Sequence, residues 1–139
     1  MILLDTSVLV YAVGEAHKQR TPCQRIVNAI VAGELDASTT PQVIQEFVHV
    51  YGRRRGRAEA AARAADWVDL LSPLVDADAD GVREALAWFA DTDLDATDAF
   101  LAAVTHLGDG TRLVSTDPDF AVLEDRWVTP AALAATLDR

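Results

Sequence analysis

Short apolar runs bounded by polar residues alternate with longer segments of helical periodicity along the chain. Residues 2–4 (ILL) and 112–115 (RLVS) are typical of buried strands in a parallel sheet. Shorter strands are expected at three further places, near 35–37, 74–75 and 127–128. These runs predict a sheet built from short, mostly buried strands.

The segments between these strands have the spacing of helices. From Pro41 to Tyr51 apolar side chains recur on one helical face, and Pro41 suits a first helical position after a threonine cap. Residues 56–71 are rich in alanine, the strongest helix former. Further helices are expected at about 20–32, 81–90, 96–107 and 130–137. Strands alternating with helices predict an α/β fold, a three-layer α/β/α sandwich around a central, mostly parallel sheet.

Composition adds an expectation about size and location. The chain has 139 residues, half of them apolar, which suits one globular domain over 1–139. No uninterrupted apolar stretch approaches the ~20 residues of a membrane helix, and the opening apolar run has no basic leader. Cys23 is the only cysteine, so no internal disulfide can form. We expect a cytoplasmic protein with no membrane partner.

The charge balance argues against a simple nucleic-acid binder. Asp and Glu number 22 and Lys and Arg 12, giving a net charge of −10, whereas sequence-blind nucleic-acid binders are normally basic. The one basic cluster is RRRGR, Arg53 to Arg57. Its arginines could lie at the C-terminal end of a helix, where the helix dipole favours cations, and they could equally well contact phosphate. A nucleic-acid role therefore requires local positive charge or bound cations.

Two acids follow the principal strands. Asp5 comes directly after residues 2–4, and Asp117 comes two residues after 112–115. In an open α/β sheet the ligand site lies beyond the carboxyl ends of the strands. Either acid alone could simply cap a helix.

Two more acids occupy unusual helical positions. Glu46 lies three residues from Val43 and four from Val50, so it borders the apolar stripe of its helix. Asp98 follows Asp95 by three residues, which makes Asp95 the expected N-cap and Asp98 either half of a capping box or a site residue.

If these four carboxylates lie close together, their mutual repulsion requires a bound cation to offset it. Each pair of carboxylates ~5 Å apart repels by ~3 kcal/mol at an effective dielectric near 20. Oxygen ligands without His or Cys favour Mg²⁺ or Mn²⁺, with waters and substrate phosphate completing the shell.

Four motifs, LLDTSVLVYA, QEF, DATDAFLAA and LVSTDPDF, occur in this order along the chain. Together they resemble the PIN-domain nucleases, and specifically the VapC toxins of type II (VapBC) toxin–antitoxin systems. The resemblance implies a single PIN domain over 1–139 with a PIN-like sandwich fold. It also implies a Mg²⁺- or Mn²⁺-dependent endoribonuclease that hydrolyses RNA phosphodiester bonds, a VapB-type antitoxin as partner, and a homodimer.

The resemblance also implies roles for individual residues. Asp5 and Asp98 would bind the principal metal ion, while Glu46 and Asp117 would orient the water, help it lose its proton or hold a second ion. These four are the expected catalytic acids. Three further residues would assist them, two as polar supports and one as an auxiliary acid: Thr6, Ser115 and Asp119.

Two alternatives stay open at this point. The serious one is a PIN-fold protein that binds RNA or a partner without cutting. The remote one is a calcium-binding loop from Asp76 to Gly81, which matches the first positions of an EF-hand loop but has Ala87 where the bidentate glutamate should be.

Overall fold

The computed structural model describes residues 1–138. Its centre is a sheet of four parallel strands in the order β2-β1-β3-β4. Their bounds are β1 Ile2–Leu4, β2 Ala37–Ser38, β3 Arg112–Val114 and β4 Trp127–Val128.

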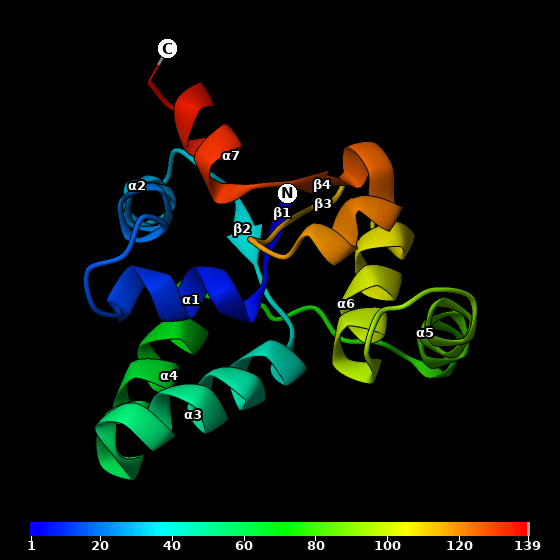
Figure 1. Cartoon of the computed structure of the whole chain (residues 1–139), viewed down its shortest axis with the longest axis horizontal. Helices are drawn as coiled ribbons and strands as arrows, with labels where there is room; N and C mark the ends of the chain where they lie inside the picture. The colour runs from blue at the N-terminus through cyan, green and yellow to red at the C-terminus, as the bar shows by residue number, and fades with distance from the viewer. Residues whose placement is uncertain (139) are drawn as a thin grey trace.

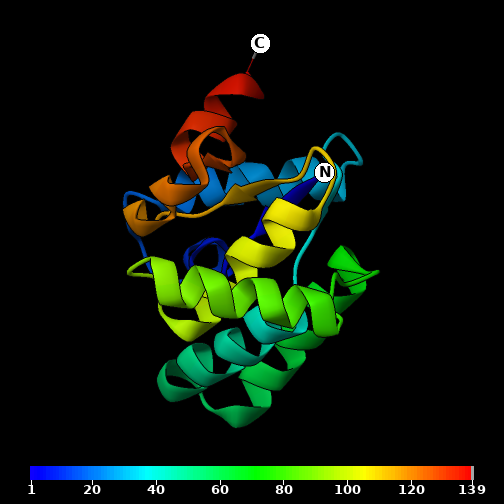
Figure 2. The same cartoon turned by 90° about the vertical axis from the view of Figure 1, so that its right-hand side faces the viewer.

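Helices fill the connections between the strands. They are α1 Thr6–Val13, α2 Arg20–Val31, α3 Pro41–Arg55, α4 Arg57–Leu71, α5 Ala79–Asp91, α6 Ala96–Leu107, the 3₁₀ segment η1 Pro118–Arg126, and α7 Pro130–Thr136. In Figure 1, α2 and α7 lie to the left of the sheet and α5 and α6 to its right. Figure 2 shows α5 running across the outer side of α6. The predicted α/β architecture with a parallel sheet flanked by helices is confirmed.

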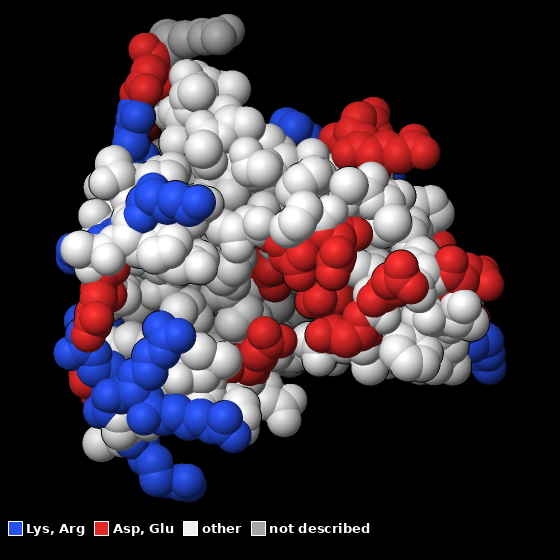
Figure 3. Space-filling model, in the orientation of Figure 1, with Lys and Arg blue, Asp and Glu red and all other residues white. Residues whose placement is uncertain are grey.

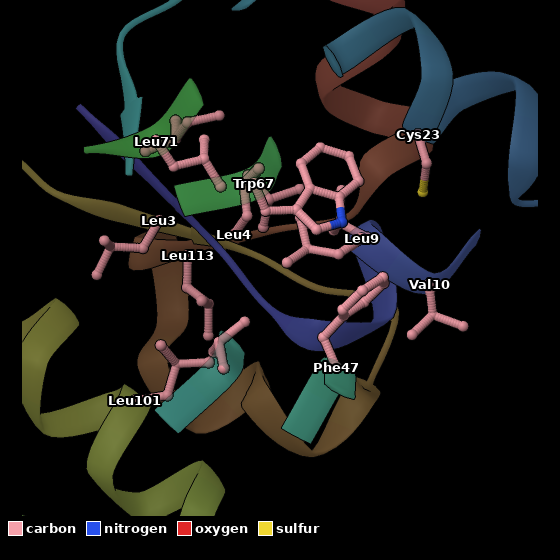
Figure 4. Close-up of a cluster of buried hydrophobic side chains, with 14 of the residues drawn as sticks. Leu3, Leu4, Leu9, Val10, Cys23, Phe47, Trp67, Leu71, Leu101 and Leu113 are labelled. Atoms are coloured by element: carbon pink, nitrogen blue, oxygen red, sulfur yellow. The ribbon is translucent and has the colours of Figure 1, made fainter. Parts of the chain in front are cut away.

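The core joins residues from the strands to residues of the surrounding helices. Figure 4 shows Leu3, Leu4 and Leu113 of the sheet beside side chains from helices on either side. Phe47 of α3 is fully buried and meets the ring of Trp67 edge to face, with centroids 6.3 Å apart. This contact fixes α3 against α4, and α3 also packs on α1.

Most predicted helices are present, with shifts of a few residues, but α1 is not predicted. Its sequence, TSVLVYAV, is apolar on nearly every side, and five of its eight residues are buried. Such a run has no polar face to give a helical period.

Two of the predicted strands differ from the structure. The strand expected at 74–75 is absent, so that prediction is wrong: Val75 donates one backbone hydrogen bond to the Thr39 carbonyl (2.9 Å), and no ladder follows. The strand expected at 35–37 is found at 37–38. None of the helices within residues 1–138 is long and apolar enough to cross a bilayer.

The strand order determines where a ligand would bind. From β1 the chain passes first to β2 on one side of β1 and later to β3 on the other. In such sheets the connections diverge at this point and leave a crevice at the carboxyl ends of the two strands. Asp5 follows β1 directly, and Ser115 follows β3, so both lie at this crevice.

Candidate functional site

A hollow of about 370 Å³ opens at the crevice between β1 and β3. It is lined by all four predicted acids together with eight other residues: Asp5, Glu46, Asp98, Asp117, then Thr6, Ser7, Val10, Tyr11, Val50, Arg54, Asp95 and Thr116. Figure 3 shows acidic side chains gathered around a recess on this face of the molecule, with a basic cluster at the lower left, where α3 and α4 meet. The sequence motifs are far apart along the chain, and the fold brings their acids to one place.

Asp5 is the most buried of these acids, with 8% of its surface exposed. Its carboxylate accepts hydrogen bonds from the Thr6 backbone N–H (2.7 Å), the Ser115 hydroxyl (2.6 Å) and, more weakly, the Ser7 hydroxyl (3.4 Å). Burial raises the pKa of Asp5, while these donors oppose the rise and the charge of Asp117 adds to it.

Ser115 connects the two sides of the crevice. Its hydroxyl donates to Asp5 and accepts the backbone N–H of Asp117 (3.0 Å). The backbone N–H of Thr116 in turn donates to the Ser7 hydroxyl (3.3 Å). The segment after β3 is thereby attached to the segment after β1, which holds Asp5 and Asp117 in fixed relation.

Asp98 enters the hollow from the first turn of α6. Its backbone N–H donates to the carboxylate of Asp95 (2.8 Å), so the predicted N-cap is confirmed. The pKa of Asp98 is raised to about 7, first by burial and then by the neighbouring carboxylates of Asp5, Asp95, Asp117 and Glu46. The four other acids thus act electrostatically on one group, as a shared site requires.

Glu46 reaches the hollow from the opposite wall, on α3. Its side chain is half-buried, and burial followed by the charges of Asp5 and Asp95 raises its pKa. The Thr6 hydroxyl lies close enough to offset part of this rise, although Thr6 Oγ1 makes no hydrogen bond of normal geometry within residues 1–138. A buried hydroxyl without a partner therefore faces the acids.

Three helical segments begin at this hollow. Asp5 is the N-cap of α1, Asp95 of α6 and Asp117 of η1, and each carboxylate accepts a backbone N–H of its own segment. The N-terminal end of a helix carries partial positive charge. These helix starts partly offset the repulsion between the carboxylates, but the raised pKa values show that they do not abolish it.

The donor set fits a hard divalent cation. The hollow offers carboxylate and hydroxyl oxygens and has no His or Cys in its lining. Within residues 1–138 no three Asp, Glu, His or Cys side chains are arranged so that together they could hold a metal ion. An open arrangement of carboxylates matches Mg²⁺, which usually binds through one or two carboxylates and keeps several waters.

Two acidic features of the sequence lie outside the hollow. Asp119 is exposed and not part of the lining, and its backbone N–H donates to Asp117 Oδ1 (2.9 Å). In the Asp76–Gly81 stretch, α5 begins at Ala79, Asp78 caps it by accepting the Gly81 N–H (2.9 Å), and Asp80 pairs with Arg83. A helix in place of the loop rules out an EF-hand geometry there.

Sequence reasoning missed the part that Ser7 and Asp95 take in the hollow: Ser7 donates to Asp5, and Asp95 contributes negative charge besides its cap. Arg54 belongs to the predicted basic cluster Arg53 to Arg57, but it was not singled out as the arginine that brings the only positive charge into the lining. Arg54 stands eight residues after Glu46, a spacing that returns to the same helical face. That spacing could have indicated its position.

Comparisons with known proteins agree with this geometry. The PIN domain family matches residues 2–126, and the chain belongs to the PIN-domain family. Ribonuclease VapC7 of Mycobacterium tuberculosis is 46% identical over 130 residues, covering 90% of this chain and 88% of VapC7. Ribonuclease VapC13 of the same organism is 34% identical over 124 residues, covering 86% of this chain and 92% of VapC13.

A solved structure supports the fold. The crystal structure of M. tuberculosis VapC20, described as a sarcin-ricin loop cleaving toxin, superposes with a TM-score of 0.70. The match covers 89% of this chain and 95% of VapC20 at 22% sequence identity. The resemblance to PIN-domain VapC ribonucleases is therefore confirmed.

Proposed function

We propose that the acidic hollow is the active site of a divalent-metal-dependent endoribonuclease, and that the chain is the toxin of a type II toxin–antitoxin pair. One observation carries the proposal. Acids from four distant motifs, Asp5, Glu46, Asp98 and Asp117, line one hollow, and the charges of the other three add to burial in raising the pKa of Asp98. Kinship with curated VapC ribonucleases makes RNA the substrate class.

Asp5 and Asp98 would hold the metal ion, with Mg²⁺ proposed and Mn²⁺ as its substitute. When bound, the ion supplies positive charge for the developing transition state and lowers the pKa of its water ligand. Ser115 and Thr6 N–H keep the Asp5 carboxylate oriented, because both donate to it. The Thr6 hydroxyl is the further polar support beside Glu46.

Glu46 is suited to take the proton from the attacking water. It faces the hollow, and its raised pKa brings it closer to neutrality, where a general base works best. Asp117, across the hollow and fixed by Ser115, would orient the water or hold a second ion. Attack of the water oxygen on phosphorus breaks the P–O bond, leaving one end of the RNA as a phosphate monoester and the other as a free hydroxyl.

The proposal also covers the protein partner, the oligomeric state, the location and the domain organisation of the chain. VapC toxins in general act on RNA and pair with VapB antitoxins, and we extend this to a cognate VapB-type antitoxin for this chain. We also propose a homodimer, a cytoplasmic location and a single PIN domain over residues 1–139. The dimer is testable by the mass of the purified protein in solution.

The site assignment is tested by RNA cleavage with Mg²⁺ or Mn²⁺ and with EDTA. The wild type should cleave only with the divalent ion. Asp5→Asn and Asp98→Asn should lower the rate by about a hundredfold or more, because each removes a charge from the proposed site. At Asp5, the N-cap of α1, asparagine is preferred to alanine because it still caps a helix. Asp66→Asn, on the exposed side of α4, is the matched control and should cleave like the wild type.

The alternative function makes a different prediction. A PIN-fold protein that only binds RNA or a partner would not cleave with either ion. If Asp5→Asn still cleaves RNA, the acidic hollow is not the active site, and the nuclease site lies elsewhere on the protein.

A further inference from the structure

The acidic hollow contains one positive charge, the guanidinium of Arg54. The other charged residues in the lining are all acids. Arg54 is exposed, and among residues 1–138 it has no ion pair and no side-chain hydrogen bond. An arginine that lines a hollow with five acids and pairs with none of them is free to bind an external anion.

The position of Arg54 separates it from the proposed metal site. Glu46, Val50 and Arg54 follow each other at four-residue intervals on α3, and all three line the hollow. Eight residues of helix advance about 12 Å along the axis. Arg54 therefore suits a neighbouring phosphate of the same strand better than the phosphate that is cleaved.

The hollow continues beyond Arg54 into a groove along α1. A second hollow of about 340 Å³ shares Val10, Tyr11 and Arg54 with the first and extends to Gly14 and His17. A third, of about 350 Å³, shares Val10 and Arg54 and adds a second positive charge from Arg55. Glu15 lines both extensions, so an anion would bind on their α3 side.

An aromatic surface lies in this groove. The rings of Tyr11 and His17 are stacked, with centroids 4.6 Å apart and planes 19° from parallel. Tyr11 is half-buried and lines both the acidic hollow and its extension, while His17 is exposed. Proteins that bind single-stranded nucleic acid combine positive charge along the backbone with aromatic rings on which bases stack.

We propose that Arg54 and the stacked pair Tyr11–His17 form a subsite for the nucleotide adjacent to the cleaved bond of a single-stranded RNA. Arg54 binds the phosphate of that nucleotide, and the aromatic pair packs against its base. The inference rests on the proposed function, because it takes the acidic hollow as the place of cleavage. It adds a positioning role for Arg54 that the four acids do not supply.

Arg53 provides a matched control for Arg54. It is the preceding residue, is exposed like Arg54, and lines a separate hollow with Gln45 and His49 between α3 and α4. Arg53→Gln and Arg54→Gln each remove one positive charge and differ only in the side of α3 from which it is removed. Arg54→Lys restores the charge at the proposed subsite.

The test measures the affinity for a short fluorescein-labelled single-stranded RNA at several salt concentrations. Ca²⁺ replaces Mg²⁺ in these measurements, and a gel shows that the RNA stays intact. A lost phosphate contact lowers the slope of log affinity against log salt by about 0.7 for a single strand. Arg54→Gln should show this lower slope, while Arg53→Gln and Arg54→Lys keep the wild-type slope. With Mg²⁺, Arg54→Gln should raise KM about tenfold and change kcat less than about threefold.

The aromatic part is tested separately with Tyr11→Leu, which keeps an apolar side chain in place. Loss of base stacking should weaken RNA binding about tenfold with an unchanged salt slope, since no charge is removed. An unchanged affinity would remove the aromatic pair from the subsite.

The outcomes distinguish the subsite from the nuclease assignment. If the wild type cleaves RNA but Arg53→Gln and Arg54→Gln bind it equally, the subsite is wrong and the proposed function stands. If the wild type never cleaves but Arg54→Gln alone lowers the salt slope, the proposed function fails and the RNA-binding groove stands. If Arg54→Gln binds RNA normally and instead loses affinity for a protein partner, the subsite is overturned in favour of a protein interface.

Discussion

At Asp98, burial and four neighbouring carboxylates all favour the protonated form, and the pKa rises to about 7. The same group in the unfolded chain has a pKa near 3.8. In the metal-free protein the folded state therefore binds this proton more tightly than the unfolded state. The stability that Asp98 contributes is fully present below the unfolded pKa and is lost as the pH rises through about 7.

This gives a prediction for thermal unfolding in EDTA. The Tm of the wild type should fall between about pH 5 and about pH 8, and Asp98→Asn should flatten this fall because asparagine does not titrate. Asp66→Asn removes an exposed acid and should keep the wild-type profile. Parallel curves for the wild type and Asp98→Asn would contradict the role assigned to Asp98.

At the scale of single elements, α6 is held at both ends by side chains. Asp95 caps its start, and Arg126 reaches the carbonyl groups at its end. The guanidinium donates to the carbonyl oxygens of Thr105 (2.5 Å), Gly108 and, just beyond the helix, Thr111 (2.7 Å). The last carbonyls of a helix have no partner within it, so Arg126 satisfies groups that would otherwise be left to water.

Replacing Arg126 should therefore cost stability. Arg126→Met should lower the free energy of unfolding by about 2 kcal/mol, because several half-buried carbonyl groups lose a charged donor. Arg112→Met, an exposed arginine on β3, is the control and should change it by less than about 0.5 kcal/mol. Urea unfolding followed by circular dichroism gives both values, and equal midpoints for the two variants would refute the role of Arg126.

The elements also show what the sequence can and cannot predict. The helix from Pro41 was predictable because it carries an apolar stripe, a proline at its start and a threonine cap, Thr40, which accepts the Val43 N–H. The helix α1 was not, because a segment buried on nearly every side has no amphipathic period.

For the site, the four motifs and their order were enough to predict the four acids Asp5, Glu46, Asp98 and Asp117. The position of Asp95 in the lining depends on how α3 and α6 face each other across the hollow, which local pattern does not specify. Ser7 was overlooked because its role depends on the geometry after β1.

Over the whole molecule, negative charge dominates, with a net charge of −10. Figure 3 shows that acidic and basic side chains are segregated on one face, the acids around the hollow and the basic cluster beside it. An anionic polymer would approach such a face along the basic side once a cation occupies the hollow.

Cation binding should be visible as stabilisation of the whole fold. An ion that binds only the native state raises stability by about 2.7 kcal/mol at a hundred times its Kd. Near pH 8, Mn²⁺ should raise the Tm of the wild type and of Asp66→Asn by similar amounts, and that of Asp98→Asn by clearly less. Equal shifts in all three proteins would show that Asp98 is not a ligand.

The acids that start α1, α6 and η1 serve two purposes at once. Asp5, Asp95 and Asp117 open a helical segment and also face the hollow. A random substitution at any of these three positions would destabilise a helical segment and impair the function of the hollow at the same time. Inactive descendants of this chain that remain well folded should therefore mostly carry asparagine, serine or threonine at these three positions, since the side chains of these residues still cap a helix.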